Sequence, residues 1–200
     1  MNKNILIIYA HPHRKGHCGA ILSSLETKLK NEKYEVLDLY KMKFNPMLKE
    51  YELLSSKYRK KVSKDVSDIQ KKISASDRLI FIHPVWWYSM PAIMKGFYDR
   101  ILTSGYAFKY KKVFFGLAKT SVPFLKGKKA AYFITSGSRK SFFLFVPYLW
   151  SVGFIVKGTL NFFCGIKTKI FHYGNAYIIN ENAKIKLDKL SSKGLKWLLK

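Results

Sequence analysis

Cysteine, acidic side chains and nucleotide-binding glycine motifs are all scarce in this chain of 200 residues. Its two cysteines, Cys18 and Cys164, lie far apart in the sequence. They provide neither a disulfide framework nor a CxxC metal or redox pair, which favours a reducing cytosol. The sequence has no GxGxxG and no Walker lysine, so it supports neither a dinucleotide-binding Rossmann site nor a P-loop. The opening "MNKNILIIYAHP" turns polar after six apolar residues and does not resemble a secretion leader. We therefore expect a cytoplasmic protein.

Acidic residues are outnumbered by basic ones, 12 against 37, which gives a formal net charge of +25. Such a surplus attracts anions of every kind, including phosphorylated cofactors, nucleic acid and an acidic membrane leaflet. The lysines are spread along the whole chain, without an arginine-rich arm or a basic helix of the zipper type. Because motifs with recognition geometry are absent, the sequence disfavours nucleic acid as the partner.

One apolar stretch, "FFLFVPYLWSVGFIVKGTLNFF" at 142–163, is long enough to span a bilayer. It is interrupted by Pro147, Gly153 and Lys157, and no second span accompanies it. A lysine near the middle of a span costs a few kcal/mol. We therefore predict a buried helix at a subunit interface, with contact to one membrane leaflet as the alternative.

Short apolar runs alternate with segments of helical period along the chain. Runs of consecutive apolar residues are typical of strands that are covered on both faces of a parallel sheet. The expected strands are 5–9, 35–39, 79–83, 130–135 and 169–172. The expected helices are 19–30, 63–75, 91–102 and 182–200. This order predicts an α/β fold, a doubly wound five-stranded parallel sheet with helices on both faces, in one domain over residues 1–200. Segments 40–62 and 103–128 are interpreted as long irregular loops, which are usually functional.

Three loops follow the first, third and fourth of these strands: "AHPHRKGH", "HPVWWYSMP" and "TSGSRK". In open α/β sheets a ligand binds beyond the carboxyl ends of the strands, where the strand order reverses. We therefore expect these three loops to meet at one site.

The first loop contains three histidines and leads directly into a helix, whose N-terminal N–H groups favour an anion. Arg14 and Lys15 add positive charge, and His11 and His17 offer hydrogen bonds. A zinc site is the alternative, but it needs tetrahedral ligands that usually include cysteines or carboxylates. We expect an anion-holding turn with no metal, with His11 and His17 near the phosphates and His13 in solvent.

The second loop has three consecutive aromatic residues, Trp86, Trp87 and Tyr88. Large flat rings are suited to line a planar ligand. Three in a row cannot all face one side of an extended chain, so at least one is expected to border the site and one to pack in the core. The third loop offers hydroxyls and backbone N–H groups to heteroatoms of such a ligand.

The segments "ILIIYAHP", "EVLDLYKMKFNPML", "LIFIHPVWWYSMPAIMKGFYDRIL", "YFITSGS" and "NFFCGI" together resemble the flavodoxin-like NAD(P)H:quinone oxidoreductase family. That family includes quinone reductases, modulators of drug activity and ancillary subunits of potassium-efflux systems. The resemblance implies FMN or FAD, NAD(P)H as co-substrate, a homodimer, and two-electron ping-pong reduction of quinones or related acceptors. An ancillary subunit docked on a membrane transporter remains the alternative function.

The family's flavin-binding loops map onto the same three segments of this chain. The diphosphate loop maps onto His11, Arg14, His17 and Cys18. The isoalloxazine loop maps onto Pro84, Val85, Trp86, Trp87, Tyr88 and Ser89, and the second flavin loop maps onto Thr135, Ser136, Gly137 and Ser138.

The chain departs from the family pattern at several positions. Gly16-His17-Cys18 stands where relatives usually read Ser-Phe-Asn, and Gly137-Ser138 replaces a Gly-Gly pair. Phe143 occupies the position of the family's tyrosine, which leaves Tyr148 as the candidate catalytic residue. The region 50–62 is shorter than in relatives that use FAD, which favours FMN.

Overall fold

The computed structural model describes residues 3–53, 62–113, 115, 117–138 and 151–200. A five-stranded parallel sheet forms its centre, in the order β2-β1-β3-β6-β7. The strands are β1 (Ile5–Tyr9), β2 (Tyr34–Asp38), β3 (Arg78–Pro84), β6 (Lys129–Thr135) and β7 (Lys167–Tyr173). The predicted fold class is confirmed, and the predicted strands differ from the observed ones by no more than two residues at either end.

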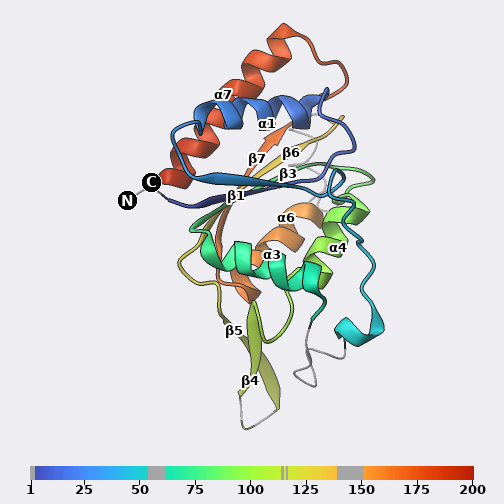
Figure 1. Cartoon of the computed structure of the whole chain (residues 1–200), viewed down its shortest axis with the longest axis vertical. Coiled ribbons are helices and arrows are strands. Elements are labelled where there is room, and N and C mark those ends of the chain that lie inside the picture. Colours follow the sequence, from blue (N-terminus) through green and yellow to red (C-terminus); the bar gives the residue numbers. More distant parts are fainter. Residues whose placement is uncertain (1–2, 54–61, 114, 116, 139–150) are drawn as a thin grey trace.

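Helices cover both faces of the sheet, α1 and α7 on one and α3, α4 and α6 on the other (Figure 1). Their bounds are α1 (His17–Lys28), α3 (Lys64–Ala75), α4 (Ala92–Ile101), α6 (Ser151–Val156) with the π-helix η3 (Lys157–Phe163), and α7 (Glu181–Leu199). Each face of the sheet has its own apolar core, because alternate residues of a strand point to opposite faces. In β1, for example, Ile5, Ile7 and Tyr9 pack with α1, whereas Leu6 and Ile8 pack with the other core.

The segment 103–128 is not irregular, which corrects the prediction. It contains an antiparallel hairpin of β4 (Phe108–Val113) and β5 (Ala118–Pro123) that projects from the body (Figure 1). The sequence did not reveal these strands, because β4 is rich in lysine and most of it is exposed on both faces. It therefore lacks the continuous apolar face by which a half-buried strand is recognised.

The apolar stretch 142–163 is described from Ser151 onward, as α6 and η3. Its buried residues Val152, Val156 and Leu160 belong to the core beside α4. Phe154 is 80% exposed and Phe162 is 61% exposed. Among the described residues, none of the helices is both long enough and apolar enough to cross a bilayer.

Candidate active site

A cavity of about 390 Å³ opens at the carboxyl ends of β1, β3 and β6. Its walls come from the three predicted loops and from the segment after β7. The lining residues are His11, His13, Lys15, Gly16, His17, Cys18, Pro84, Val85, Trp86, Thr135, Ser136, Gly137, Ala176, Tyr177 and Ile179.

The first loop folds tightly against the start of α1. A Cβ at Gly19 would lie 1.7 Å from the Arg14 carbonyl oxygen, so only glycine permits this approach. Gly16 precedes the helix in an extended conformation, and no side chain caps the helix among the described residues. The first-turn N–H groups and the positive end of the helix dipole therefore remain available to an anion.

His17, the first residue of α1, is the polar group at this helix end that most clearly requires a ligand. It is 9% exposed, and its ring stacks on Tyr173 with centroids 5.5 Å apart. Burial lowers the pKa of His17, against a smaller opposing effect of a hydrogen bond to the Ile178 backbone. Nε2 is buried and has no hydrogen-bond partner in the described part of the chain. Leaving such an atom unpaired is costly, so a ligand with a polar group at this position would be stabilised.

The other two histidines of the loop lie at the mouth of the cavity. His11 Nδ1 lies 2.7 Å from the His13 carbonyl oxygen and is within hydrogen-bond distance of the His13 N–H, 3.2 Å away. Burial lowers the pKa of His11. His13 is exposed as predicted, yet its ring packs edge-on against His11 and also lines the cavity.

The second loop makes a two-residue turn closed by two hydrogen bonds of 3.0 Å between Trp86 and Ser89. The central residues, Trp87 and Tyr88, have φ angles of 47° and 60°. Such a turn normally has Asn-Gly or a similar pair, because β-carbon sterics penalise left-handed residues. Backbone strain is thus stored beside the cavity, as is common at binding sites.

The three aromatic residues of this loop are placed differently from one another. Trp86 lines the cavity, is 43% exposed, and has its ring 6.0 Å from that of His11. Trp87 is 93% exposed and Tyr88 is 52% exposed, and neither lines the cavity. At least one aromatic residue borders the site, as expected, but none of the three is a core residue. That part of the prediction is wrong.

The third loop contributes Thr135, Ser136 and Gly137 to the wall of the cavity. The Thr135 hydroxyl lies 3.2 Å from the Cys18 thiol, and burial raises the pKa of that thiol to about 12, so Cys18 is an unreactive packing residue. The Ser136 hydroxyl lies 2.8 Å from His172 Nε2. At Gly137 a Cβ would lie 3.1 Å from the ring of Tyr177.

Sequence reasoning missed the segment that follows β7. This segment contributes Ala176, Tyr177 and Ile179 to the cavity. The signal was available, since a loop after a fifth parallel strand reaches the same edge of the sheet as the other three.

Besides Trp87 and Tyr88, the predicted residues Arg14, Ser89 and Ser138 do not line this cavity. Arg14 binds Asp38 through Nη2 and Oδ2 at 3.1 Å and approaches Glu26, so its charge is largely engaged. It lines a neighbouring hollow of about 360 Å³ rather than the main cavity. Tyr148 lies outside the described residues.

The strand order places the cavity at the point where the chain reverses direction across the sheet, between β1 and β3. A family model described as "flavodoxin-like fold" matches residues 3–192. The chain belongs to the flavodoxin-like fold family.

Two curated relatives and one solved structure illustrate what the chain is similar to. An uncharacterized NAD(P)H oxidoreductase of Haemophilus influenzae is 32% identical over 186 residues, covering 90% of this chain and 88% of the relative. A mouse ribosyldihydronicotinamide dehydrogenase [quinone] is 30% identical over 190 residues, covering 82% and 78%. The crystal structure of Smu.1420 from Streptococcus mutans superposes with a TM-score of 0.81 at 29% identity, covering 96% and 99%.

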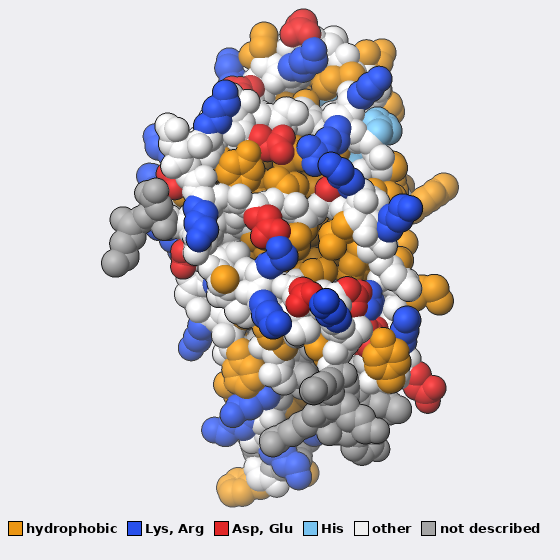
Figure 2. Space-filling view, viewed as in Figure 1, with side chains coloured by type: hydrophobic (Ala, Val, Ile, Leu, Met, Phe, Trp, Pro, Cys, Tyr) orange, Lys and Arg blue, Asp and Glu red, His pale blue; other side chains and the backbone are white. Residues whose placement is uncertain are grey.

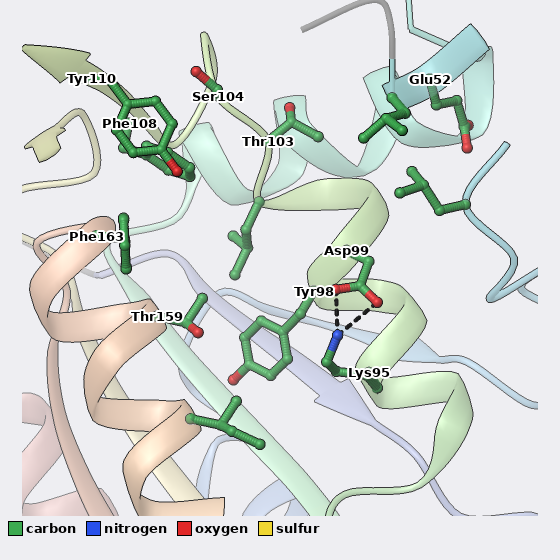
Figure 3. Close-up of a pocket in the computed structure, with 14 residues that line it drawn as sticks. Glu52, Lys95, Tyr98, Asp99, Thr103, Ser104, Phe108, Tyr110, Thr159 and Phe163 are labelled. Atoms are coloured by element: carbon green, nitrogen blue, oxygen red, sulfur yellow. Dashed lines mark hydrogen bonds and ion pairs between the residues drawn. The ribbon is translucent and has the colours of Figure 1, made fainter. Parts of the chain in front are cut away.

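A second cavity of about 430 Å³ lies between α4, the hairpin base and η3 (Figure 3). Apolar side chains such as Phe108 and Phe163 line one side of it, and on α4 the Lys95 ammonium bonds both carboxylate oxygens of Asp99, at 2.6 and 2.8 Å. The Tyr98 side chain also points into this space (Figure 3).

A buried chain of hydrogen bonds links this flavodoxin-like protein's second cavity to its first. The Tyr98 hydroxyl donates to the Tyr132 hydroxyl at 3.3 Å, and Tyr132 lies 2.8 Å from His83 Nε2. His83 Nδ1 lies 2.6 Å from the Pro84 carbonyl oxygen, which can only accept. Nδ1 therefore carries the proton and Nε2 accepts from Tyr132. Burial lowers the pKa of His83 to about 4, so the ring is neutral.

Proposed function

We propose that this protein is a flavin-dependent NAD(P)H oxidoreductase that reduces quinones or related acceptors by two-electron, ping-pong hydride transfer. The carrying observation is the cavity of about 390 Å³ at the β1/β3 reversal. It is lined by the start of α1, which no described side chain caps, and by His17, whose Nε2 has no partner among the described residues. Flavodoxin-like sheets bind FMN at this position. The names of the Haemophilus and mouse relatives support the reaction class.

The phosphate of the flavin would be held at the start of α1. His11, His17 and the backbone of Gly16 and Cys18 line that part of the cavity, and Lys15 adds a cation. Arg14 would add positive charge from outside the cavity, because its guanidinium is paired with Asp38. FMN is favoured over FAD, and a Bacillus anthracis azoreductase and a Treponema denticola general stress protein, both solved with FMN, share the fold.

The ring system would lie between the second and third loops. We assign Pro84, Val85, Trp86, Trp87, Tyr88 and Ser89 to one wall and Thr135, Ser136, Gly137 and Ser138 to the other. The turn's own hydrogen bonds use the N–H groups of Trp86 and Ser89, which leaves those of Trp87 and Tyr88 outside the pairing. When bound, a flavin supplies the hydride chemistry. The protein's part is to orient it and to place donors where negative charge develops.

Proton delivery to the reduced acceptor is assigned to Tyr148. We expect Tyr148→Phe to slow quinone reduction without abolishing it, because hydride transfer itself needs no protein nucleophile. The measurement is the steady-state rate of reduction of each quinone in a panel. Rates equal to those of wild type for every acceptor would show that Tyr148 does not belong to the site.

The first experiment is to purify the protein and record its visible spectrum. We expect the two absorption bands of an oxidised flavin, FMN on release by denaturation, and oxidation of NADH or NADPH that depends on menadione. Trp86→Ala should weaken flavin binding, whereas Ile185→Ala, an exposed apolar residue of α7, should not. A colourless protein that takes up neither FMN nor FAD and leaves menadione unreduced would overturn the proposal.

The assembly is proposed to be a cytoplasmic homodimer with one flavodoxin-like domain in each protomer. The support is the second cavity together with Phe154 and Phe162, whose exposure leaves apolar surface uncovered. Light scattering should give twice the chain mass of 23.3 kDa, and a monomeric mass would refute the dimer. The alternative of a potassium-efflux ancillary subunit gains no support from the curated relatives named above, whose names describe oxidoreductases.

A further inference from the structure

The acidic residues of this chain are absent from one long continuous segment. No Asp or Glu occurs between Asp99 and Glu181, although lysines recur throughout that span. The segment includes the whole β4–β5 hairpin. The positive charge is therefore not diluted there by acidic neighbours in sequence.

Among the described residues, the ring contacts and the side-chain hydrogen bond between the hairpin and η3 lie near the hairpin's base. The Phe108 ring packs on Phe163 with centroids 5.2 Å apart, and the Ser121 hydroxyl donates to the Phe162 carbonyl oxygen at 3.2 Å. Beyond these contacts the two strands project as an isolated ribbon (Figure 1). A two-stranded ribbon buries little and gains little stability by itself, so this extension is not explained by the stability of the fold.

Apolar side chains stand at the far end of the ribbon. Between β4 and β5, Phe115 is fully exposed and Leu117 is 91% exposed. The space-filling view shows orange and blue side chains, and no red ones, where the hairpin projects at the lower end (Figure 2).

Lysines flank this apolar tip on both strands. Lys109, Lys111, Lys112 and Lys119 are all exposed, and none forms an ion pair within the described chain. Lys112 and Lys119 are directly opposite each other in the antiparallel register. Like charges at opposed positions destabilise a strand pair. An external anion between or beside the two ammonium groups would reduce this repulsion.

We propose that the β4–β5 hairpin docks this protein on an anionic lipid bilayer. Phe115 and Leu117 enter the boundary between headgroups and acyl chains, and the four lysines contact headgroup phosphates. The spacing fits, since a strand rises about 3.4 Å per residue and interfacial elements bury their apolar side to a depth of about 5–10 Å. The long lysine stems allow the ammonium groups to stay at headgroup level. This inference does not depend on the flavin chemistry proposed above.

The test is co-sedimentation with vesicles of phosphatidylcholine containing phosphatidylglycerol, compared with pure phosphatidylcholine. We expect binding to the anionic vesicles only, weakening as salt rises. Lys111→Gln combined with Lys112→Gln should lower the partition coefficient roughly 30-fold, from about fivefold per lysine. The matched control is Lys189→Gln with Lys193→Gln on α7, also exposed, which should bind as wild type.

Insertion of the tip is tested separately from charge. Leu117→Ser should weaken vesicle binding by at least about tenfold, whereas Ile185→Ser should not. Both native cysteines are buried, so Leu117→Cys provides a selective site for an environment-sensitive fluorophore. Its emission should shift to the blue on anionic vesicles, and the same label at Ile185→Cys should not shift.

Four results would overturn the proposal. The first is wild-type protein that fails to bind anionic vesicles. The second is hairpin variants that bind as tightly as wild type. The third is a Leu117→Ser variant whose mass by light scattering differs from that of wild type, because the tip would then be a contact between copies of this chain. The fourth is lysine variants that lose affinity for duplex DNA but not for vesicles, which would assign the hairpin to nucleic acid.

Discussion

Acidification is predicted to destabilise the protein through His83, because its ring is neutral and fully buried in the native state. The pKa of His83 is lowered from 6.5 to about 4 by burial. In the unfolded chain the ring takes up a proton near its ordinary pKa, whereas in the folded protein it stays neutral until far lower pH. Between these two values the unfolded state binds more protons, so the free energy of unfolding falls as pH falls.

The size of the effect follows from the shift. One pKa unit is worth about 1.36 kcal/mol, so the full loss below pH 4 amounts to about 3 kcal/mol. Some 2 kcal/mol of this is lost between pH 7 and pH 5. For a protein of this size that corresponds to a fall of about 1 M in the urea midpoint.

The assay is urea unfolding of wild type and His83→Gln at pH 7 and pH 5. The variant keeps a polar side chain but cannot titrate. Its loss of stability between pH 7 and pH 5 should therefore be about 2 kcal/mol smaller than that of wild type. Tyr132→Phe is the matched control, because it removes a hydrogen bond but leaves the imidazole. It should be less stable by about 1 kcal/mol at both pH values and keep the wild-type pH slope. If His83→Gln and wild type lost equal stability on acidification, the assignment of the proton to His83 would be wrong.

Further predictions concern a buried ion pair, the strained turn and the anion site. Arg100 Nη2 lies 2.6 Å from Glu52 Oε1, and the Glu52 side chain is 3% exposed. Arg100→Met removes the cation of this buried pair, so it should lower the free energy of unfolding by about 3–5 kcal/mol in urea melts. An unchanged midpoint would contradict this. Tyr88→Gly should raise stability by about 0.5–1 kcal/mol by relieving its left-handed backbone, and a lower midpoint would show that the turn is not strained. His17 bonds the Ile178 backbone and has a lowered pKa, so its other ring nitrogen, Nε2, must gain a proton to bind phosphate. FMN affinity, followed by fluorescence quenching, should therefore rise up to about tenfold per pH unit from pH 9 to pH 7, and His17→Gln should abolish this dependence; a pH-independent wild-type affinity would refute it.

The architecture could be predicted because each central element has its own local signal. A strand such as "ILIIY" is apolar at every position, and it is buried on both faces of the sheet. Helix α3 places Val66, Ile69 and Ile73 on one side, at the spacing of a helical turn. Once strands and helices alternate, connection rules leave few topologies, and the three loops after β1, β3 and β6 must share an edge.

The hairpin could not be predicted in this way, because nothing buries it. The periodic signal of a strand comes from one buried face, and β4 is largely exposed. Its pairing with β5 is a backbone property that lysines do not reveal. The same holds for the aromatic loop: the order Trp-Trp-Tyr does not say that Trp86 faces the cavity while Trp87 faces solvent.

The sheet, the helices that cover it and the edge where the cavity opens follow from local sequence patterns, since periodicity and chain order are local properties of the amino acids. Which side chains are available at that edge depends on long-range packing. Packing paired Arg14 with Asp38, brought Tyr177 into the wall of the cavity and buried His17 Nε2 where no described residue is its partner. These outcomes depend on distances between residues that are remote in the chain, which packing fixes and composition does not.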